Sequence, residues 1–230
     1  MSKVHLISGA TSGIGLAIYK QLKSSGDRVI PAVRRPGDAE KLETNEFIEA
    51  DYKNPKAVRE AFKAFDTSID SFINCAGIAV GKPIWDNTPD EVQTLIDINL
   101  ISPMATIAEL KPNFKKGAAI FLFSSVSAYR GGWDDLYIAS KGAINSLVKS
   151  LSIKFAPDVR VIGIAPGVTA DTRMTRERKA QDLPQVIEKI PLKALATPEE
   201  ISNLIVSLMG PAGTHITGTM IDINGGTYLR

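Results

Sequence analysis

Short runs of β-branched and apolar residues alternate with amphipathic helical stretches along the whole chain. The runs predicted as strands are residues 4–8, 28–33, 47–50, 69–74, 118–123, 159–165 and 220–223. Helices are predicted at about 13–25, 55–65, 89–115, 136–155 and 198–209, and Pro103 and Pro112 are candidate breaks in the third. Strands that alternate with helices form a mostly parallel sheet covered on both faces. The pattern predicts an α/β fold, a Rossmann-like doubly wound sheet, and we expect residues 1–230 to form a single domain.

Composition excludes several kinds of partner. The formal net charge is +2, which is too small to indicate nucleic-acid or membrane-surface binding. No apolar run is long enough to span a bilayer, and no secretory signal precedes the first strand. Cys75 is the single cysteine, and the two histidines, His5 and His215, are far apart, so no zinc site is expected. These features predict a cytoplasmic protein with no metal.

A glycine-rich turn follows the first predicted strand. Gly9, Gly13 and Gly15 have the spacing Gly-x3-Gly-x-Gly and stand immediately before a helix. Glycines let the backbone turn tightly and approach a pyrophosphate, and a helix N-terminus supplies free N–H groups and positive potential. The turn therefore indicates a dinucleotide phosphate site. A tight strand-to-helix connection without a ligand is the alternative for this motif alone.

The turn resembles the cofactor signature of the short-chain dehydrogenase/reductase family, and the rest of the chain continues the resemblance. The matching motifs are Asn74-Cys75-Ala76-Gly77, Asn99, Ser124-Ser125, Tyr137-x3-Lys141, Pro166-Gly167, Thr217-Gly218 and Asn224-Gly225-Gly226. They occur in the family's order and cover essentially the whole chain. The resemblance implies an oxidoreductase that interconverts a carbonyl and an alcohol.

Tyr137 and Lys141 are one helical turn apart and therefore lie on one face of a helix. A free tyrosine has a pKa of about 10, and a nearby ammonium favours the phenolate. We expect Tyr137 to be the acid/base and Lys141 to lower its pKa. The resemblance implies that Lys141 also binds the nicotinamide ribose and that Asn99 holds a water for proton relay. A helix-bending or capping role is the alternative for Asn99.

The catalytic serine is less clearly indicated. Aligning the double serine with the family motif selects Ser125 to orient the substrate oxygen. The loop from there to Tyr137 is one residue shorter than usual, and counting back from the tyrosine would select Ser124. We favour Ser125, because loops absorb deletions more easily than strands. Ser127 is a third candidate.

The end of the second strand bears on cofactor choice. Val33 stands where NAD-binding members usually place an acid, and Arg34 and Arg35 follow. Arginine can grip a phosphate with two hydrogen bonds. We therefore expect NADP(H) to be preferred, with NAD(H) possible. The alternative is a solvated arginine pair, and Ser12 stands where many NADP-binding members carry a basic residue.

The resemblance implies further cofactor contacts. Asp51 matches the family's adenine contact, although it could instead cap a loop. The segment after the fourth strand should floor the cleft, and the one after the sixth should contact the carboxamide. The complete set of expected cofactor-binding residues, besides Tyr137 and Lys141, is Gly9, Thr11, Ser12, Gly13, Ile14, Gly15, Arg34, Arg35, Asp51, Tyr52, Asn74, Ala76, Gly77, Pro166, Gly167, Val168 and Thr169.

The stretch at about 169–197 corresponds to the family's variable substrate lid. Its Thr172 comes one place later than a family threonine, and residues 173–179 form a basic cluster that could meet an anion or be a solvated face. Trp85, Trp133 and Met174 are candidates for an apolar pocket or for core and subunit contacts.

The predicted function is NADPH-dependent reduction of a small carbonyl substrate, or the reverse reaction. The alternatives are an NAD-dependent alcohol or diol dehydrogenase and a non-catalytic NADPH-binding regulatory protein. The resemblance also implies a homodimer or homotetramer, with one interface formed by the long helices that carry Asn99 and Tyr137.

Overall fold

The computed structural model describes residues 2–177 and 180–229. Within them, one sheet contains β1 (Val4–Ser8), β2 (Arg28–Val33), β3 (Ile48–Glu49), β4 (Ile69–Asn74), β5 (Phe114–Phe123), β6 (Val159–Pro166) and β7 (Met220–Ile223). Neighbouring strands are all parallel, in the order β3-β2-β1-β4-β5-β6-β7. The predicted α/β, Rossmann-like doubly wound fold is confirmed.

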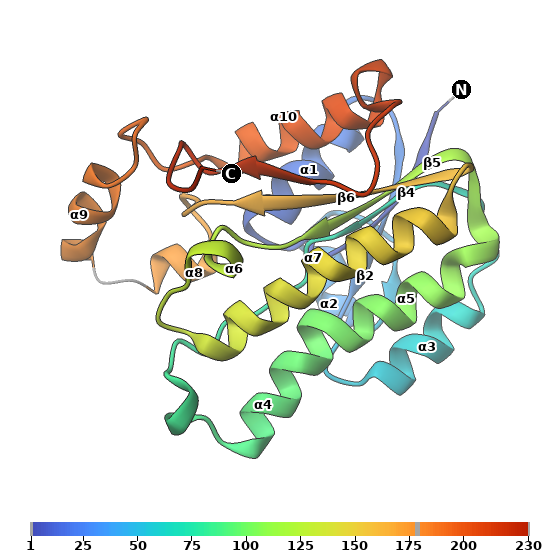
Figure 1. Cartoon of the computed structure of the whole chain (residues 1–230). Helices are drawn as coiled ribbons and strands as arrows, with labels where there is room; N and C mark the ends of the chain where they lie inside the picture. Colours follow the sequence, from blue (N-terminus) through green and yellow to red (C-terminus); the bar gives the residue numbers. More distant parts are fainter. Residues whose placement is uncertain (1, 178–179, 230) are drawn as a thin grey trace.

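Helices cover both faces of the sheet (Figure 1). α1 (Gly13–Ser24) and α10 (Pro198–Met209) lie on one face, while α3 (Pro55–Lys63), α5 (Ser102–Leu110) and α7 (Asp135–Phe155) lie on the other. α4 (Pro89–Ile96) precedes α5 and extends beyond the sheet. Shorter helices occupy the connections: α2 (Pro36–Glu40), α6 (Ser127–Arg130), α8 (Arg173–Arg176) and α9 (Leu183–Glu188).

Successive residues of β5 serve two separate cores. Ile120 and Leu122 pack in the core under α3, α5 and α7, whereas Phe121 and Phe123 pack in the core under α1 and α10. Side chains alternate across a strand, so a strand with helices on both faces must be apolar at every position. This requirement explains why the buried part of β5, residues 118–123, reads as an unbroken apolar run, whereas Lys115 and Lys116 at its start are exposed.

The structure divides the helical region predicted after Thr88, for which Pro103 and Pro112 were the candidate breaks. α4 passes into a π-helical turn at Asp97–Ile101, and α5 follows directly. Pro103 does not break α5, because it lies in the first turn, where a missing N–H has little cost. A 3-10 turn, Lys111–Asn113, then ends the helix, and β5 starts at Phe114 rather than at Ala118.

Both helices that were expected to begin at a threonine do so. Thr88 and Thr197 each form a reciprocal capping box with the glutamate three residues later. Among the described residues, no helix combines the length and apolar content needed to cross a bilayer.

Candidate active site

The glycine turn lies between β1 and α1, where the strand order reverses. A Cβ on Gly9, which has φ of +72°, would lie 2.7 Å from the Ala76 nitrogen, and one on Gly15 would lie 2.1 Å from the Gly9 oxygen. The Ser8 hydroxyl donates to Asn74 Oδ1 at 2.8 Å and accepts from the Ala76 N–H at 3.3 Å. The turn is thus held against the segment after β4, and the two positions require glycine.

The N-terminus of α1 suits an anionic ligand. Its N-cap residue, Ser12, is extended and makes no side-chain cap hydrogen bond, and the first turn carries no acidic residue. The first N–H groups of a helix have no intrahelical acceptor, and the helix dipole favours negative charge there. Thr172 packs beside this turn, because a Cβ on Gly13 would lie 3.4 Å from Thr172 Cγ2. The turn therefore fits the pyrophosphate of a dinucleotide.

Lys141 carries a buried charge beside this turn. It is 5% exposed, and burial lowers the pKa of its ammonium to about 8. Within the described residues its Nζ makes one hydrogen bond, donating to the Phe123 carbonyl at 2.9 Å. A Cβ on Gly77 would lie 3.3 Å from the same Nζ. An ammonium has three donors, so Lys141 retains donors for the hydroxyl groups of a ligand.

Tyr137 lies one turn before Lys141 on α7, as expected. The ammonium is 5.6 Å from the centre of the tyrosine ring. The lowered pKa expected for Tyr137, from the ammonium together with a positive nicotinamide, is not found in the ligand-free chain: burial raises this pKa, and a hydrogen bond with Ser125 only partly opposes it. The physical reason is that burial disfavours the charged phenolate. The phenol is therefore protonated at neutral pH.

The neighbouring serines make different contacts. Ser124 is 3% exposed, and its hydroxyl donates to the Lys141 carbonyl at 2.9 Å. Ser125 accepts from the Ser127 N–H at 3.2 Å and is hydrogen-bonded to Tyr137. Ser124 thus fastens β5 to α7, while Ser125 faces the tyrosine. This difference favours Ser125 as the serine that meets a substrate.

Asn99 lies in the π-helical turn and is 1% exposed. Its Oδ1 accepts from the Ile78 N–H at 2.8 Å, and its Nδ2 donates to the Ile78 carbonyl at 2.9 Å and to Ser140 Oγ at 3.0 Å. These contacts join the end of the β4 loop to α7, next to Lys141. The position supports the helix-bending alternative, and the side chain braces the floor of the site.

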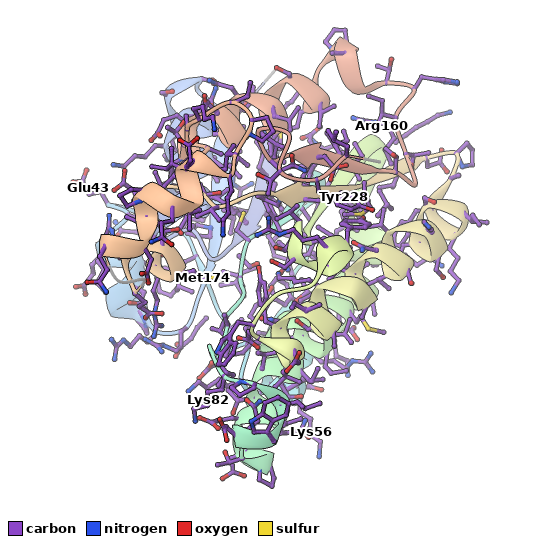
Figure 2. All side chains as sticks on the ribbon, turned by 60° about the vertical axis from the view of Figure 1, so that its left-hand side comes forward. Glu43, Lys56, Lys82, Arg160, Met174 and Tyr228 are labelled. Carbon is purple, nitrogen blue, oxygen red and sulfur yellow. The ribbon has the colours of Figure 1, made fainter. Side chains whose placement is uncertain are left out.

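Two cavities that share lining residues, Tyr137 among them, lie beside these residues. The inner cavity, of about 190 Å³, is lined by both serines, Tyr137 and Lys141, together with Ile14, Cys75, Gly77 and 166–169. The outer cavity, of about 520 Å³, is lined by 79–81 and 130–134, among other residues. Met174 contributes to both cavities and is labelled in Figure 2.

Burial raises the pKa of the Cys75 thiol, which agrees with an unreactive cysteine.

The apolar candidates divide between these cavities and the surface. Trp133 lines the outer cavity, whereas Trp85, which is 78% exposed, lines neither cavity. Thr172 and Thr175, on the lid side, line the inner cavity. Two members of the basic cluster, Arg178 and Lys179, lie outside the described residues.

At the end of β2, Arg34 and Arg35 are exposed, with 54% and 65% of their side chains accessible. Their Nε atoms lie 4.0 and 3.7 Å from Asp38 Oδ2, and Lys41 Nζ lies 2.9 Å from Asp38 Oδ1. The Lys41 hydrogen bond and the two arginines hold the pKa of Asp38 below its ordinary value. Asp38 was not predicted from the sequence. The signal that could have indicated it is an acidic residue in the first turn of a short helix that starts with a proline.

The residues expected near the adenine are used differently. Asp51 Oδ1 accepts from the Lys53 N–H at 3.0 Å, which is the loop-capping alternative. Tyr52 is buried in the core, and its hydroxyl lies 3.1 Å from Thr106 Oγ1. The Tyr52 ring therefore cannot contact a ligand, although its backbone lies at the end of the sheet.

Asp134 is a structural residue of the site that sequence reasoning missed. Its carboxylate accepts from the N–H groups of Tyr137, Val80 and Gly81 at 2.9, 2.7 and 2.6 Å. It thus caps α7 directly before the tyrosine and fixes one wall of the outer cavity. The signal that could have indicated Asp134 is an aspartate just before a predicted helix.

Among the described residues, no group of three or more His, Cys, Asp or Glu side chains is gathered to hold a metal.

Known proteins resemble this chain over its full length. Residues 9–228 match the family described as enoyl-(acyl carrier protein) reductase. A 1,2-dihydroxy-1,2-dihydronaphthalene dehydrogenase of Ralstonia sp. is 32% identical, with 100% of this chain and 98% of that protein covered.

Two solved structures from Brucella melitensis are also similar. A short-chain dehydrogenase/reductase described as a glucose/ribitol dehydrogenase has a TM-score of 0.91 and 28% identity, with 100% of both chains covered. A 3-ketoacyl-(acyl-carrier-protein) reductase complexed with NADH has a TM-score of 0.86 and 25% identity, with 98% of each chain covered. Together with the motifs and the geometry, these matches show that the chain belongs to the short-chain dehydrogenase/reductase family, oxidoreductases that interconvert alcohols and carbonyls with a nicotinamide cofactor.

Proposed function

We propose that this protein is an NADPH-preferring carbonyl reductase in which Tyr137 is the proton donor. The observation that carries the proposal is geometric: the Tyr137 hydroxyl is hydrogen-bonded to Ser125 in a cavity that Lys141 and Ile14 of the glycine turn also line. A group whose pKa is raised in the ligand-free site holds its proton at neutral pH, which suits an acid in the reducing direction.

The residues of the inner cavity divide the work of reduction. A nicotinamide held in this cavity would supply the hydride that reduces the carbonyl carbon. Ser125 donates a hydrogen bond to the substrate oxygen and polarises the carbonyl. Tyr137 transfers its phenolic proton to that oxygen as negative charge develops there. The Lys141 ammonium, 5.6 Å from the ring centre, stabilises the phenolate that remains.

The cofactor would lie across the carboxyl ends of the central strands. The first N–H groups of α1 would bind its pyrophosphate, and the spare donors of Lys141 would bind the ribose hydroxyls. We place the remaining contacts on the segment after β4 and on 166–169, which lines the inner cavity beside Tyr137.

Cofactor preference rests on the end of β2. Arg34 and Arg35 are the exposed cations that follow Val33, and an added phosphate would compete with Asp38 for them. Asp38 also supports the second candidate, an NAD-dependent alcohol or diol dehydrogenase, because it partly neutralises the arginines. The relative from Ralstonia is likewise named as a dehydrogenase of a dihydroxy compound.

Titration of the purified protein with NADPH and NADH, followed by nicotinamide fluorescence, tests this proposal. We expect NADPH to bind more tightly, and the double variant Arg34→Ala, Arg35→Ala to lose roughly 100-fold in NADPH affinity and little in NADH affinity. Arg28→Ala, at the opposite end of the same strand, is the control. Tighter binding of NADH by the wild type would favour the second candidate instead.

We also propose that the protein self-associates through α5 and α7. Ile101, Met104 and Ile153 are apolar residues of these helical segments and are 38%, 43% and 80% exposed. Exposed apolar groups on adjacent helices are typical of subunit contacts. Light scattering after size exclusion should give at least a dimeric mass, and a monomer at micromolar concentration would contradict the proposal.

A further inference from the structure

Arg130, the last residue of α6, lines both the inner and the outer cavity. Its side chain forms no ion pair or hydrogen bond with another described residue. The other charged groups of the outer cavity have partners: Asp134 accepts three backbone N–H groups, and Glu177 Oε1 accepts from Arg173 Nε at 2.7 Å. Arg130 is therefore the unpaired charge of this cavity, within the part of the chain that the structure describes.

The surroundings of Arg130 are mostly apolar. Trp133, 70% exposed, and Met174, 38% exposed, both line the outer cavity, together with Ala79, Val80 and Ile138. Met174, from α8, and the segment 79–81 line this cavity from different parts of the chain. A volume of about 520 Å³ is that of a small-molecule pocket rather than of a single side chain.

The short helix α6 links this arginine to the candidate catalytic serine. Ser125 directly precedes the turn, and the Arg130 N–H donates to the Val126 carbonyl at 3.3 Å, which closes one helical turn. One ligand can therefore contact the Ser125 hydroxyl at one end and the guanidinium at the other. An arginine binds a carboxylate with two parallel hydrogen bonds, which fixes orientation as well as charge.

We propose that Arg130 determines substrate specificity by binding an anionic group, a carboxylate, on the carbonyl substrate. The reacting carbonyl lies at Ser125 and Tyr137, the carboxylate lies at Arg130, and Trp133 and Met174 contact the apolar body between them. The identity of the reacting end rests on the proposed function, whereas the anion site does not. The substrate class is thus an oxo acid with an apolar middle, or the corresponding hydroxy acid.

Binding at this site can be measured without turnover. The chain has two tryptophans, and Trp85→Phe leaves Trp133, on the cavity wall, as the single reporter. We expect phenylacetate to change the Trp133 fluorescence and to bind about 10-fold more tightly than the neutral phenylacetamide. Equal binding of the two, or no change with either, would overturn the proposal.

Variants in the same background locate the anion. Arg130→Gln should remove the preference for phenylacetate over phenylacetamide, and Arg130→Lys should keep part of it. Arg176→Gln is the matched control, because it removes the same charge from α8, where Arg176 is exposed and lines neither cavity. Loss of the preference in the control but not in Arg130→Gln would contradict the assignment. Benzylphosphonate, if preferred to phenylacetate, would assign the anion as a phosphate and reject the carboxylate.

A turnover experiment separates this inference from the proposed function. 4-Oxo-4-phenylbutanoate and its methyl ester present the same carbonyl with and without the negative charge. We expect the ratio of kcat/KM, acid over ester, to fall about 10-fold in Arg130→Gln. Turnover of the ester but not of the acid would sink the specificity proposal alone. Loss of turnover for both compounds, with the binding preference intact, would count against the proposed function alone.

Discussion

The sheet holds a buried polar cluster at each of its two ends, and only one of them is reachable by a ligand. Near the amino end, His5 Nδ1 lies 2.7 Å from Ser71 Oγ, and His5 Nε2 lies 3.2 Å from Asp27 Oδ2. Serine, histidine and aspartate are the residue types of a hydrolase triad. His5 and Ser71 are at most 1% exposed, however, and neither cavity described above contains them.

The cluster at the carboxyl end has the opposite properties. Tyr137, Lys141 and Ser125 line a cavity, and Lys141 keeps donors without acceptors. Residue type alone would point to the amino-end cluster as readily as to this one. The comparison teaches that unsatisfied hydrogen-bonding groups next to a cavity, rather than residue types, distinguish a site from internal structure.

The largest expected effect is on turnover. Tyr137→Phe removes the hydroxyl and leaves the ring, so cofactor binding should be nearly unchanged while kcat falls roughly 10³-fold. Steady-state rates with a ketone, together with the cofactor titration, test this prediction. Rates close to wild type would mean that this cluster is as inert as the one at the amino end.

Alanine variants of the two serines should have opposite effects, one on turnover and the other on the free energy of unfolding. Ser125→Ala should lower kcat roughly 100-fold with little loss of stability, because the hydroxyl meets the substrate. Ser124→Ala should cost about 1 kcal/mol of unfolding free energy, because it leaves the Lys141 carbonyl without its donor. Kinetics and urea unfolding of both variants would show the reverse pattern if Ser124 were the catalytic residue.

Lys141→Met should stabilise the fold while it removes activity. Burial lowers the Lys141 pKa from its ordinary value of about 10.5 to about 8. Between these two pH values the lysine is protonated in the unfolded chain but not in the folded one, so the free energy of unfolding decreases as pH falls from about 10.5 to 8. Below pH 8 the lysine is charged in both the folded and the unfolded chain, and the full free-energy cost of burying the ammonium remains. At pH 7 we expect the variant to be about 1–3 kcal/mol more stable, measured by urea unfolding. A destabilised variant would indicate that the charge is well compensated.

The smallest effect is the pH dependence of the amino-end cluster. Burial lowers the pKa of His5, and the carboxylates of Asp27 and Asp70 only partly oppose this. Below pH 6.5, the ordinary value, the unfolded chain binds a proton that the folded chain does not, so stability is lost as pH falls further. The slope from one group is at most about 1.4 kcal/mol per pH unit.

His5→Gln keeps a side chain that can hydrogen-bond to Ser71 and does not titrate. Unfolding free energies at pH 7.5 and 5.5 should therefore differ less in this variant than in the wild type. Turnover per folded molecule should be unaffected, since neither cavity contains His5. If the unfolding free energies of the variant and the wild type depended on pH identically, His5 would not be the cause of the stability loss.

Much of this molecule was predictable from local patterns. Short runs of β-branched and apolar residues located the seven strands of the described sheet, and the threonine–proline–acid pattern located the first residues of α4 and α10. The helical spacing of Tyr137 and Lys141 placed both side chains in the inner cavity. These features depend on neighbours in sequence, so short-range rules are enough to predict them.

The sequence by itself determined the alternating α/β order, the glycine turn and the paired tyrosine and lysine, because backbone geometry and helical period act over a few residues. Only the tertiary structure decided which serine faces Tyr137, that burial raises the Tyr137 pKa, and that Asp38 accompanies the arginines. It also decided that Arg130 has no partner among residues 2–177 and 180–229. Burial, desolvation and charge partnership depend on which distant segments meet, and a linear pattern does not contain that information.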